Sequence, residues 1–112
     1  MRIEMPWPPS VNTYWRNVSG KTLISAKGRA YRKVVSDMGW TLPKYGTARL
    51  RVVIKAYPPD RRRRDLDNLP KAIFDSLERA GVFDDDEQID FFSIKRCAVE
   101  KPGLIMLRIE TV

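Results

Sequence analysis

The centre of the chain, residues 60–87, reads DRRRRDLDNLPKAIFDSLERAGVFDDDE. Four consecutive arginines lead into two aspartates, Asp65 and Asp67, which are separated by a single residue. A short helical pattern follows, and four more acids come after it at positions 84–87. Arginine side chains bind a polyanion, whereas clustered carboxylates repel one. Both make sense together if a divalent cation binds the carboxylates and faces a phosphate, because such cations prefer oxygen ligands.

The composition indicates one globular domain, residues 1–112, that binds a polyanion. The chain is 43% apolar, which is enough for a core, and it has 21 Lys and Arg against 14 Asp and Glu, a net charge of +7. Five of the acids lie between residues 84 and 90, so the remainder is more basic still. A surface of this kind favours nucleic acid over membrane as the partner.

Several kinds of chemistry are excluded by the residues that are missing. The chain has no histidine and one cysteine, Cys97, so it has no His-dependent catalysis, intrachain disulfide or Cys-rich zinc site. Cys97 lies in an apolar pattern and is expected to be an inert buried thiol. No apolar run approaches the ~18 residues of a membrane span, and MRIEMPWPP at the N-terminus lacks the apolar core of a signal peptide. We therefore expect a cytoplasmic protein with no membrane association and no small-molecule cofactor.

The periodicity predicts an α+β fold, with a small mixed β-sheet covered by two α-helices. Strands are expected over residues 1–5, 50–57, 91–99 and 104–111, helices over about 26–40 and 69–80, and a hairpin or loop around 17–20. A turn at 100–103 predicts that the last two strands form an antiparallel hairpin. Ser25 is a suitable N-cap for the first helix, and Asp67 or Asn68 for the second, which Gly81 ends.

The pair Asp65 and Asp67 has two interpretations. In an extended segment, residues two apart point the same way, so the two carboxylates can converge where the chain enters the helix. For an isolated D-x-D before a helix, however, the more frequent arrangement is an N-cap and an arginine pair. The second acidic cluster favours a metal site only if the fold bends it back toward Asp65.

The basic residues also allow two interpretations. Lys71 is four residues after Asp67 on one helix face, so it either contacts a scissile phosphate or pairs with Asp67 or Asp75. Asp75 is expected to pair with Arg79 or Lys71. The arginines at 61–64 either contact phosphates or are simply solvated. In an extended segment, only some of them can point toward one site. A second basic region contains interleaved aromatic residues. It either forms another DNA contact or contributes its aromatic residues to the core. This region comprises Tyr14, Trp15, Arg16, Lys21, Lys27 and Arg29.

These stretches resemble the RusA family of Holliday junction resolvases. The resemblance covers most of the chain, with PWPPSVNTYWR at residues 6–16 matching the family's opening and DRRRRDLDNLPKAIFDSLERAGVFDDDEQI at 60–89 matching its central motif. It implies a homodimeric endodeoxyribonuclease of DNA recombination and repair that cuts four-way junction DNA by paired symmetric nicks. It also implies a requirement for Mg²⁺, for which Mn²⁺ can substitute.

Matched by position, the resemblance assigns roles to particular residues. The catalytic residues fall on Asp65, Asp67, Lys71 and Asp86, and the metal ligands on Asp65, Asp67 and Asp86, with Asp85 as a further acid. Asp84 stands where the family motif can hold an apolar residue, so the ligands among 84–86 stay open. The expected DNA-binding residues are Arg61, Arg62, Arg63, Arg64, Asn68 and Lys71, with Arg16 and Lys27 from the second basic region.

The chemistry of the residues agrees with this assignment. Carboxylates ~4 Å apart repel by about 4 kcal/mol at an effective dielectric of ~20, and a divalent cation relieves that repulsion while activating water in a chain without histidine. Two alternatives are a non-catalytic nucleic-acid-binding module, and a metal-dependent nuclease acting on other branched substrates.

Overall fold

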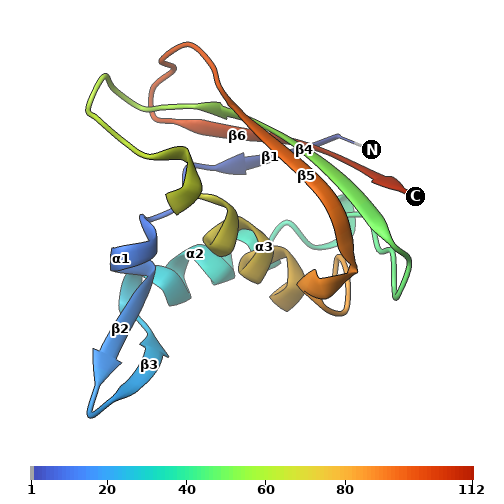
Figure 1. The fold of residues 1–112 in the computed structure, drawn as a ribbon, viewed down its shortest axis with the longest axis horizontal. Helices are drawn as coiled ribbons and strands as arrows, with labels where there is room; N and C mark the ends of the chain where they lie inside the picture. Colours follow the sequence, from blue (N-terminus) through green and yellow to red (C-terminus); the bar gives the residue numbers. More distant parts are fainter. Residues whose placement is uncertain (1) are drawn as a thin grey trace.

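The computed structural model describes residues 2–112, which form an α+β fold with a four-stranded mixed sheet, a two-stranded hairpin and three α-helices (Figure 1). Met1, with which the first strand was predicted to begin, lies outside the described residues. In chain order the elements are β1 (Arg2–Pro6), α1 (Val11–Tyr14), β2 (Trp15–Val18), β3 (Lys21–Ile24), α2 (Ala26–Ser36), η1 (Gly39–Thr41), β4 (Leu50–Tyr57), η2 (Leu66–Asn68), α3 (Pro70–Arg79), η3 (Asp86–Gln88), β5 (Ile89–Arg96) and β6 (Leu104–Thr111), where η denotes a 3-10 helix.

The main sheet has the strand order β1-β6-β4-β5. β4 is antiparallel to β6 and parallel to β5, so the predicted hairpin between the last two strands is wrong: β4 lies between them. The physical reason is that β4 buries Leu50, Val52, Ile54 and Ala56 completely and needs neighbours on both edges. β5 is mostly exposed and takes an edge position instead.

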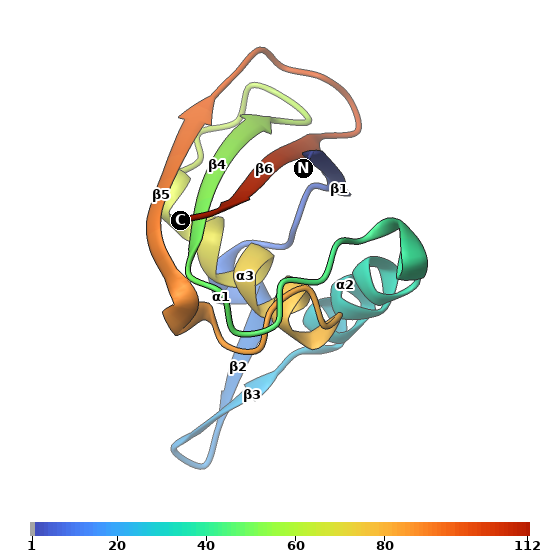
Figure 2. The same cartoon turned by 90° about the vertical axis from the view of Figure 1, so that its right-hand side faces the viewer.

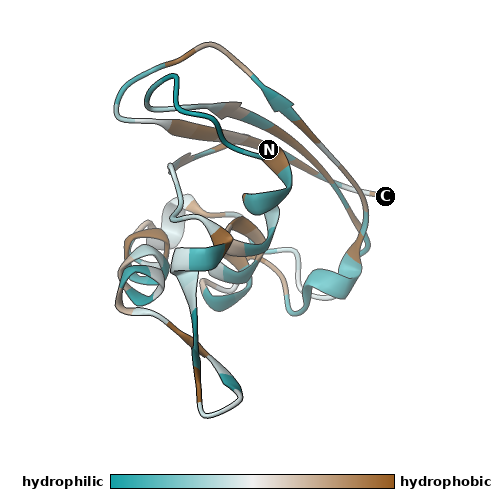
Figure 3. Cartoon of the chain, turned by 60° about the vertical axis from the view of Figure 1, so that its left-hand side comes forward, coloured by the Kyte–Doolittle hydropathy of each residue, from teal (hydrophilic) through white to brown (hydrophobic). Residues whose placement is uncertain are grey.

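The helices lie on one face of this sheet, and the other face is uncovered (Figures 1 and 2). The core between the two layers contains Met5, Ile54, Ile73, Leu77 and Leu107, each at most 1% exposed. Figure 3 shows long hydrophobic stretches along these strands. The two predicted helices are confirmed, although α2 ends at Ser36, and a third helix, α1, was not predicted.

The predicted local features of α2 and the hairpin are confirmed. The Ser25 hydroxyl accepts a hydrogen bond from the Gly28 N–H at 3.0 Å and caps α2. β2 and β3 pair antiparallel around Ser19 and Gly20, both with positive φ, as a two-residue hairpin turn requires. This hairpin projects away from the sheet, beyond the helices (Figures 1 and 2).

Cys97 is half-buried just after β5 rather than buried within a strand. β5 ends one residue before Cys97, at Arg96, where its pairing with β4 ends at Ala56. Among residues 2–112, no helix is both long enough and apolar enough to cross a membrane.

Candidate active site

Helix α3 presents a stripe of three charged residues. Lys71, Asp75 and Glu78 are spaced at i, i+4 and i+7, which places them on one helix face. The opposite side of α3 packs into the core through Ile73 and Leu77, which are fully buried. Burial of the apolar face therefore fixes the direction in which the charged stripe points.

The acidic residues after α3 are held in a defined turn by Gln88, which is only 5% exposed. Its side-chain oxygen accepts hydrogen bonds from the N–H groups of Asp84 and Asp85 at 2.8 and 2.9 Å. Its side-chain nitrogen donates to the carbonyls of Gly46 and Ala48. Gln88 thus fastens the turn to the loop before β4, and this turn carries the acids back toward α3.

Three carboxylates converge at this place. Oxygens of Glu78, Asp85 and Asp86 lie within 4.8 Å of one another, and the Asp86 N–H donates to Glu78 Oε1 at 3.0 Å. Burial, together with the neighbouring charge of Asp85, raises the pKa of the Asp86 carboxyl above its usual range. Asp75 also raises the pKa of Asp86, whereas Lys71 lowers it, so all these side chains share one electrostatic environment.

A network of hydrogen bonds fixes the middle of the stripe. Arg32 of α2 binds Asp75 with two bonds, Nε to Oδ2 at 2.7 Å and Nη2 to Oδ1 at 3.1 Å. The Tyr14 hydroxyl donates to the same carboxylate, and burial together with this bond raises the pKa of Tyr14. The expected pairing of Asp75 with Arg79 is present at 3.9 Å, but Arg32 is the closer partner.

Lys71 lies beside an aromatic ring rather than beside a carboxylate. Its ammonium is 5.7 Å from the centroid of the Trp15 ring, and Arg32 lies 5.6 Å from the same centroid. Among residues 2–112, no carboxylate oxygen lies within ion-pair distance of the Lys71 ammonium, so the alternative pairing with Asp67 or Asp75 is not seen. The ammonium is exposed and available to an anion.

Asp65 and Asp67 lie at the other end of α3, and the extended segment predicted to hold both of them is not present. Asp65 is extended, but the chain turns into η2 at Leu66, so the alternation of an extended segment stops there. Both aspartates are exposed and are not members of the close cluster of Glu78, Asp85 and Asp86. Neither Asp67 nor Asn68 caps α3: the cap position is Leu69, which has no side-chain oxygen, and Pro70 begins the helix.

The arginine loop, residues 61–64, precedes Asp65 and is strongly hydrophilic (Figure 3). Arg64 is half-buried, pairs with Asp60 at 2.7 Å and lies 5.7 Å from the Trp7 ring centroid. Arg61, Arg62 and Arg63 are exposed. Asp60 also contacts Arg62, through a longer ion pair of 3.7 Å and a hydrogen bond from the Arg62 backbone N–H at 3.0 Å. The loop therefore folds around Asp60, while the side chains of Arg61 and Arg63 are exposed.

A cavity of about 440 Å³ lies between this loop and the N-terminal segment. It is lined by Trp7, Ser10, Arg63, Arg64, Asp65, Asn68 and Leu69. The structure thus brings Asp65, Asn68 and two of the predicted DNA-binding arginines together. Arg16 on β2 and Lys27 in the first turn of α2 are exposed but belong to the projecting hairpin and its neighbour.

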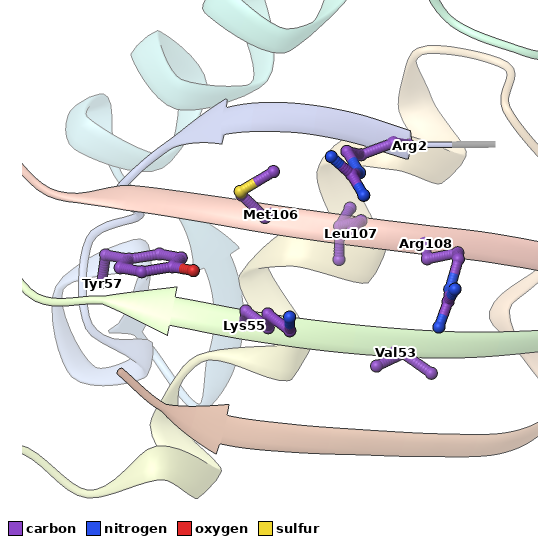
Figure 4. Close-up of a pocket in the computed structure, with 7 residues that line it drawn as sticks. All are labelled: Arg2, Val53, Lys55, Tyr57, Met106, Leu107 and Arg108. Carbon is purple, nitrogen blue, oxygen red and sulfur yellow. The ribbon is translucent and has the colours of Figure 1, made fainter. Parts of the chain in front are cut away.

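A second cavity, of about 230 Å³, lies on the uncovered face of the sheet and is separate from the carboxylates. Arg2, Lys55 and Arg108 surround it together with Tyr57 and Met106 (Figure 4). The strands lie between these side chains and the helices (Figure 4). It therefore contributes nothing to the carboxylate site.

A family model described as endodeoxyribonuclease RusA matches residues 6–110, which includes every element from α1 to β5. The chain belongs to the RusA family of endodeoxyribonucleases. The resemblance seen in the sequence is confirmed.

Individual RusA proteins are similar over nearly the whole chain. Crossover junction endodeoxyribonuclease RusA of Shigella sonnei strain Ss046 is 43% identical over 96% of this chain and 91% of its own length. The protein of the same name from Escherichia coli strain K12 is 42% identical, and that of Enterobacteria phage 82 is 43% identical, with the same coverage. The family to which the chain belongs thus consists of nucleases that act on DNA.

Three residues of this site were missed by sequence reasoning, and a fourth, Tyr14, was expected only as a DNA contact or a core aromatic. Glu78 was overlooked because it lies inside a helix, although its spacing from Lys71 places it on the same face. Gln88 was detectable from the D-x-x-Q spacing of a capping box with Asp85, which the structure contains. Nothing in the sequence could have paired Arg32 and Tyr14 with Asp75, because their separations of 43 and 61 residues carry no local pattern.

Proposed function

We propose that this chain is a Mg²⁺-dependent endodeoxyribonuclease that resolves four-way DNA junctions by paired, symmetric nicks. The observation that carries the proposal is the return of the acidic turn to the face of α3 that holds Lys71. The arginine loop precedes this helix, separated from it by Asp65 and η2. The names of the similar RusA proteins, which specify crossover junctions, support the choice of substrate.

The donor set suits a divalent cation. Glu78, Asp85 and Asp86 offer only oxygen ligands, and the raised pKa of Asp86 reflects like charges that a cation would relieve. We propose Asp85 and Asp86 as ligands, with Glu78 beside them and with Asp65 and Asp67 as the further metal-binding and catalytic carboxylates. A cation held there supplies a Lewis acid for the phosphate and lowers the pKa of the attacking water.

The chain's own residues do the remaining work. Lys71 contacts the scissile phosphate and offsets the charge that develops on it. The exposed arginines of the arginine loop, with Asn68, Arg16 and Lys27, bind the DNA backbone. The ion pair of Arg32 with Asp75 holds the helix face on which Lys71 and Glu78 are presented.

Two matched nicks require two active sites related by two-fold symmetry, so we propose that the functional unit is a homodimer. The proposed place of action is the cytoplasm.

The test is cleavage of a synthetic four-way junction in Mg²⁺, beside a linear duplex of the same sequence. Symmetric nicks in the junction alone, lost in Asp67→Asn and Asp86→Asn while junction binding persists, support the proposal. Loss of binding in step with cleavage contradicts the catalytic assignment. Tight binding by the wild type without cleavage in Mg²⁺ or Mn²⁺ indicates a binding module, and equal cleavage of other branched substrates indicates a broader nuclease.

A further inference from the structure

The uncovered face of the main sheet carries a regular row of side chains along β4. The residues of β4 that point to this face are Arg51, Val53, Lys55 and Tyr57, which alternate with the fully buried residues of the core. A basic residue therefore lies on each side of Val53, and an aromatic ring ends the row. Because each residue of a strand adds about 3.3 Å, the row from Arg51 to Tyr57 is about 20 Å long.

The neighbouring strands add cations to this row. The antiparallel registers place Arg108 of β6 beside Val53, and Arg2 of β1 beside Arg108. On the other side, Lys95 of β5 is the register partner of Lys55. With Arg51, five basic side chains share this face, and all five are exposed.

The acids on this face do not neutralise these cations. Two acids, Glu4 and Glu110, lie on the same side of the sheet. Glu110 forms a long ion pair of 3.8 Å with Arg108, in which both side chains are more than half exposed. Among residues 2–112, no carboxylate lies within ion-pair distance of Arg2 or Lys55. Five bases against two acids leave the face with a positive charge that suits an anionic ligand.

The cavity of about 230 Å³ lies among these cations. Figure 4 shows Tyr57 at one end of the cavity and Arg108 at the other, with Lys55 between them. The volume is below the roughly 300 Å³ at which pockets for whole small molecules begin. The cavity therefore suits one small unit of a longer ligand, such as a phosphate with its sugar or base.

Two aromatic rings and an apolar floor complete the surface. Tyr57 is partly exposed at one end of the face, and Phe91 of β5 is 47% exposed at the other. The Arg51 guanidinium lies 4.9 Å from the centroid of the Phe91 ring. The half-buried side chains of Val53 and Met106 lie between the two ends. Rings interleaved with basic residues are typical of surfaces that bind single-stranded nucleic acid, in which bases stack on rings and phosphates contact cations.

We propose that the uncovered face of the sheet is a binding site for single-stranded DNA. In this site Arg2, Lys55 and Arg108 contact phosphates, and a base stacks on the Tyr57 ring. Duplex DNA fits the face less well, because its bases are already stacked inside the helix and leave the rings and the apolar floor without a partner. The length of the row accommodates a segment of a few nucleotides.

This site is separate from the proposed nuclease site. The strands lie between the uncovered face and the helix layer that carries the carboxylates (Figures 1 and 4). The inference therefore goes beyond the proposed function and does not depend on it.

The first test measures the fluorescence anisotropy of a labelled short oligothymidylate in EDTA, which removes divalent cations. The double variant Lys55→Gln with Arg108→Gln loses two phosphate contacts. Its affinity should fall roughly tenfold, and the slope of log binding constant against log salt concentration should decrease in magnitude by about 0.7 for each contact. The control, Lys33→Gln with Lys44→Gln, removes the same charge from exposed positions outside this face and should change neither quantity. Equal losses in the two double variants overturn the proposal.

The second test separates the Tyr57 ring from its hydroxyl. Tyr57→Leu keeps an apolar side chain but removes the ring, so the affinity for the oligothymidylate should fall about fivefold or more. Tyr57→Phe keeps the ring and should bind as wild type does, and thermal melting checks that both variants are folded. Equal affinities for Tyr57→Leu and Tyr57→Phe overturn the stacking role.

Competition distinguishes this site from the nuclease site. Excess unlabelled four-way junction should leave the oligothymidylate bound, because the two ligands occupy opposite sides of the sheet. Complete displacement by the junction, or equal competition by a linear duplex, overturns the proposal. A protein that binds the oligothymidylate through Lys55 and Arg108 but never cuts junctions contradicts the proposed function alone.

Discussion

Arg32 and Asp75 form a two-bond ion pair that joins α2 to the helix carrying Lys71 and Glu78. Their side chains are only 20% and 15% exposed, and the Tyr14 hydroxyl completes the coordination of the carboxylate. The pair ties α3 to α2, because breaking it would leave a poorly solvated charge between the two helices.

Asp75→Asn is expected to lower the free energy of unfolding by about 2 kcal/mol, since it leaves Arg32 without its counter-charge in a partly buried place. Urea denaturation measures this loss. Asp37→Asn is the matched control, because it breaks the exposed pair of Lys33 and Asp37 and should cost less than about 1 kcal/mol. Equal losses in the two variants would show that the Arg32 pair has no special structural role.

Glu78→Gln separates the charge of Glu78 from its hydrogen bond. The glutamine oxygen can still accept the bond from the Asp86 N–H, so the unfolding midpoint should hardly change. If Glu78 stands beside the cation, the Mg²⁺ concentration for half-maximal cleavage should rise by roughly tenfold. An unchanged Mg²⁺ requirement would limit Glu78 to holding the acidic turn.

Asp86 should make the metal-free protein less stable at neutral pH. Burial and Asp85 raise the pKa of the Asp86 carboxyl in the folded state. Protonated Asp86 therefore favours the folded protein at a pH below the ordinary aspartate pKa, and this stabilisation is lost as the pH rises through the raised pKa. In EDTA at pH 7, Asp86→Asn should therefore unfold at a higher temperature than wild type, and the difference should vanish at low pH. Added Mg²⁺ should stabilise wild type more than the variant. A lower melting temperature for the variant in EDTA would contradict the repulsion inferred here.

Arg63→Gln should weaken junction binding and reduce its salt dependence. Arg63 is exposed and lines the same cavity as Asp65. On duplex DNA, each phosphate contact that is lost reduces the magnitude of the slope of log binding constant against log salt concentration by about 0.9. The measurement is fluorescence anisotropy over a range of salt concentrations. Arg108→Gln, an equal change of charge on the opposite face of the sheet, should leave the slope unaltered. Equal slopes for Arg63→Gln and wild type would remove Arg63 from the DNA contacts.

Local chemistry made some parts of this protein predictable from sequence. The alternation over residues 50–57 predicted β4 with its observed bounds, Ser25 predicted the cap of α2, and Gly81, at φ +85°, predicted the end of α3. These features depend on contacts within a few residues, so the residue pattern alone determines them.

Tertiary structure decided the rest. β5 pairs parallel with β4 rather than with its sequence neighbour β6, because the most apolar strand takes the centre of the sheet. Gln88 bends the acidic turn back to Glu78 through bonds to residues about 40 positions away. Arg32 and Tyr14 reach Asp75 only after α1 and α2 have packed against α3. The sequence by itself supplied the charged groups of the proposed site, and packing of the apolar faces decided where those groups meet, because burial fixes the direction of each element and local periodicity does not.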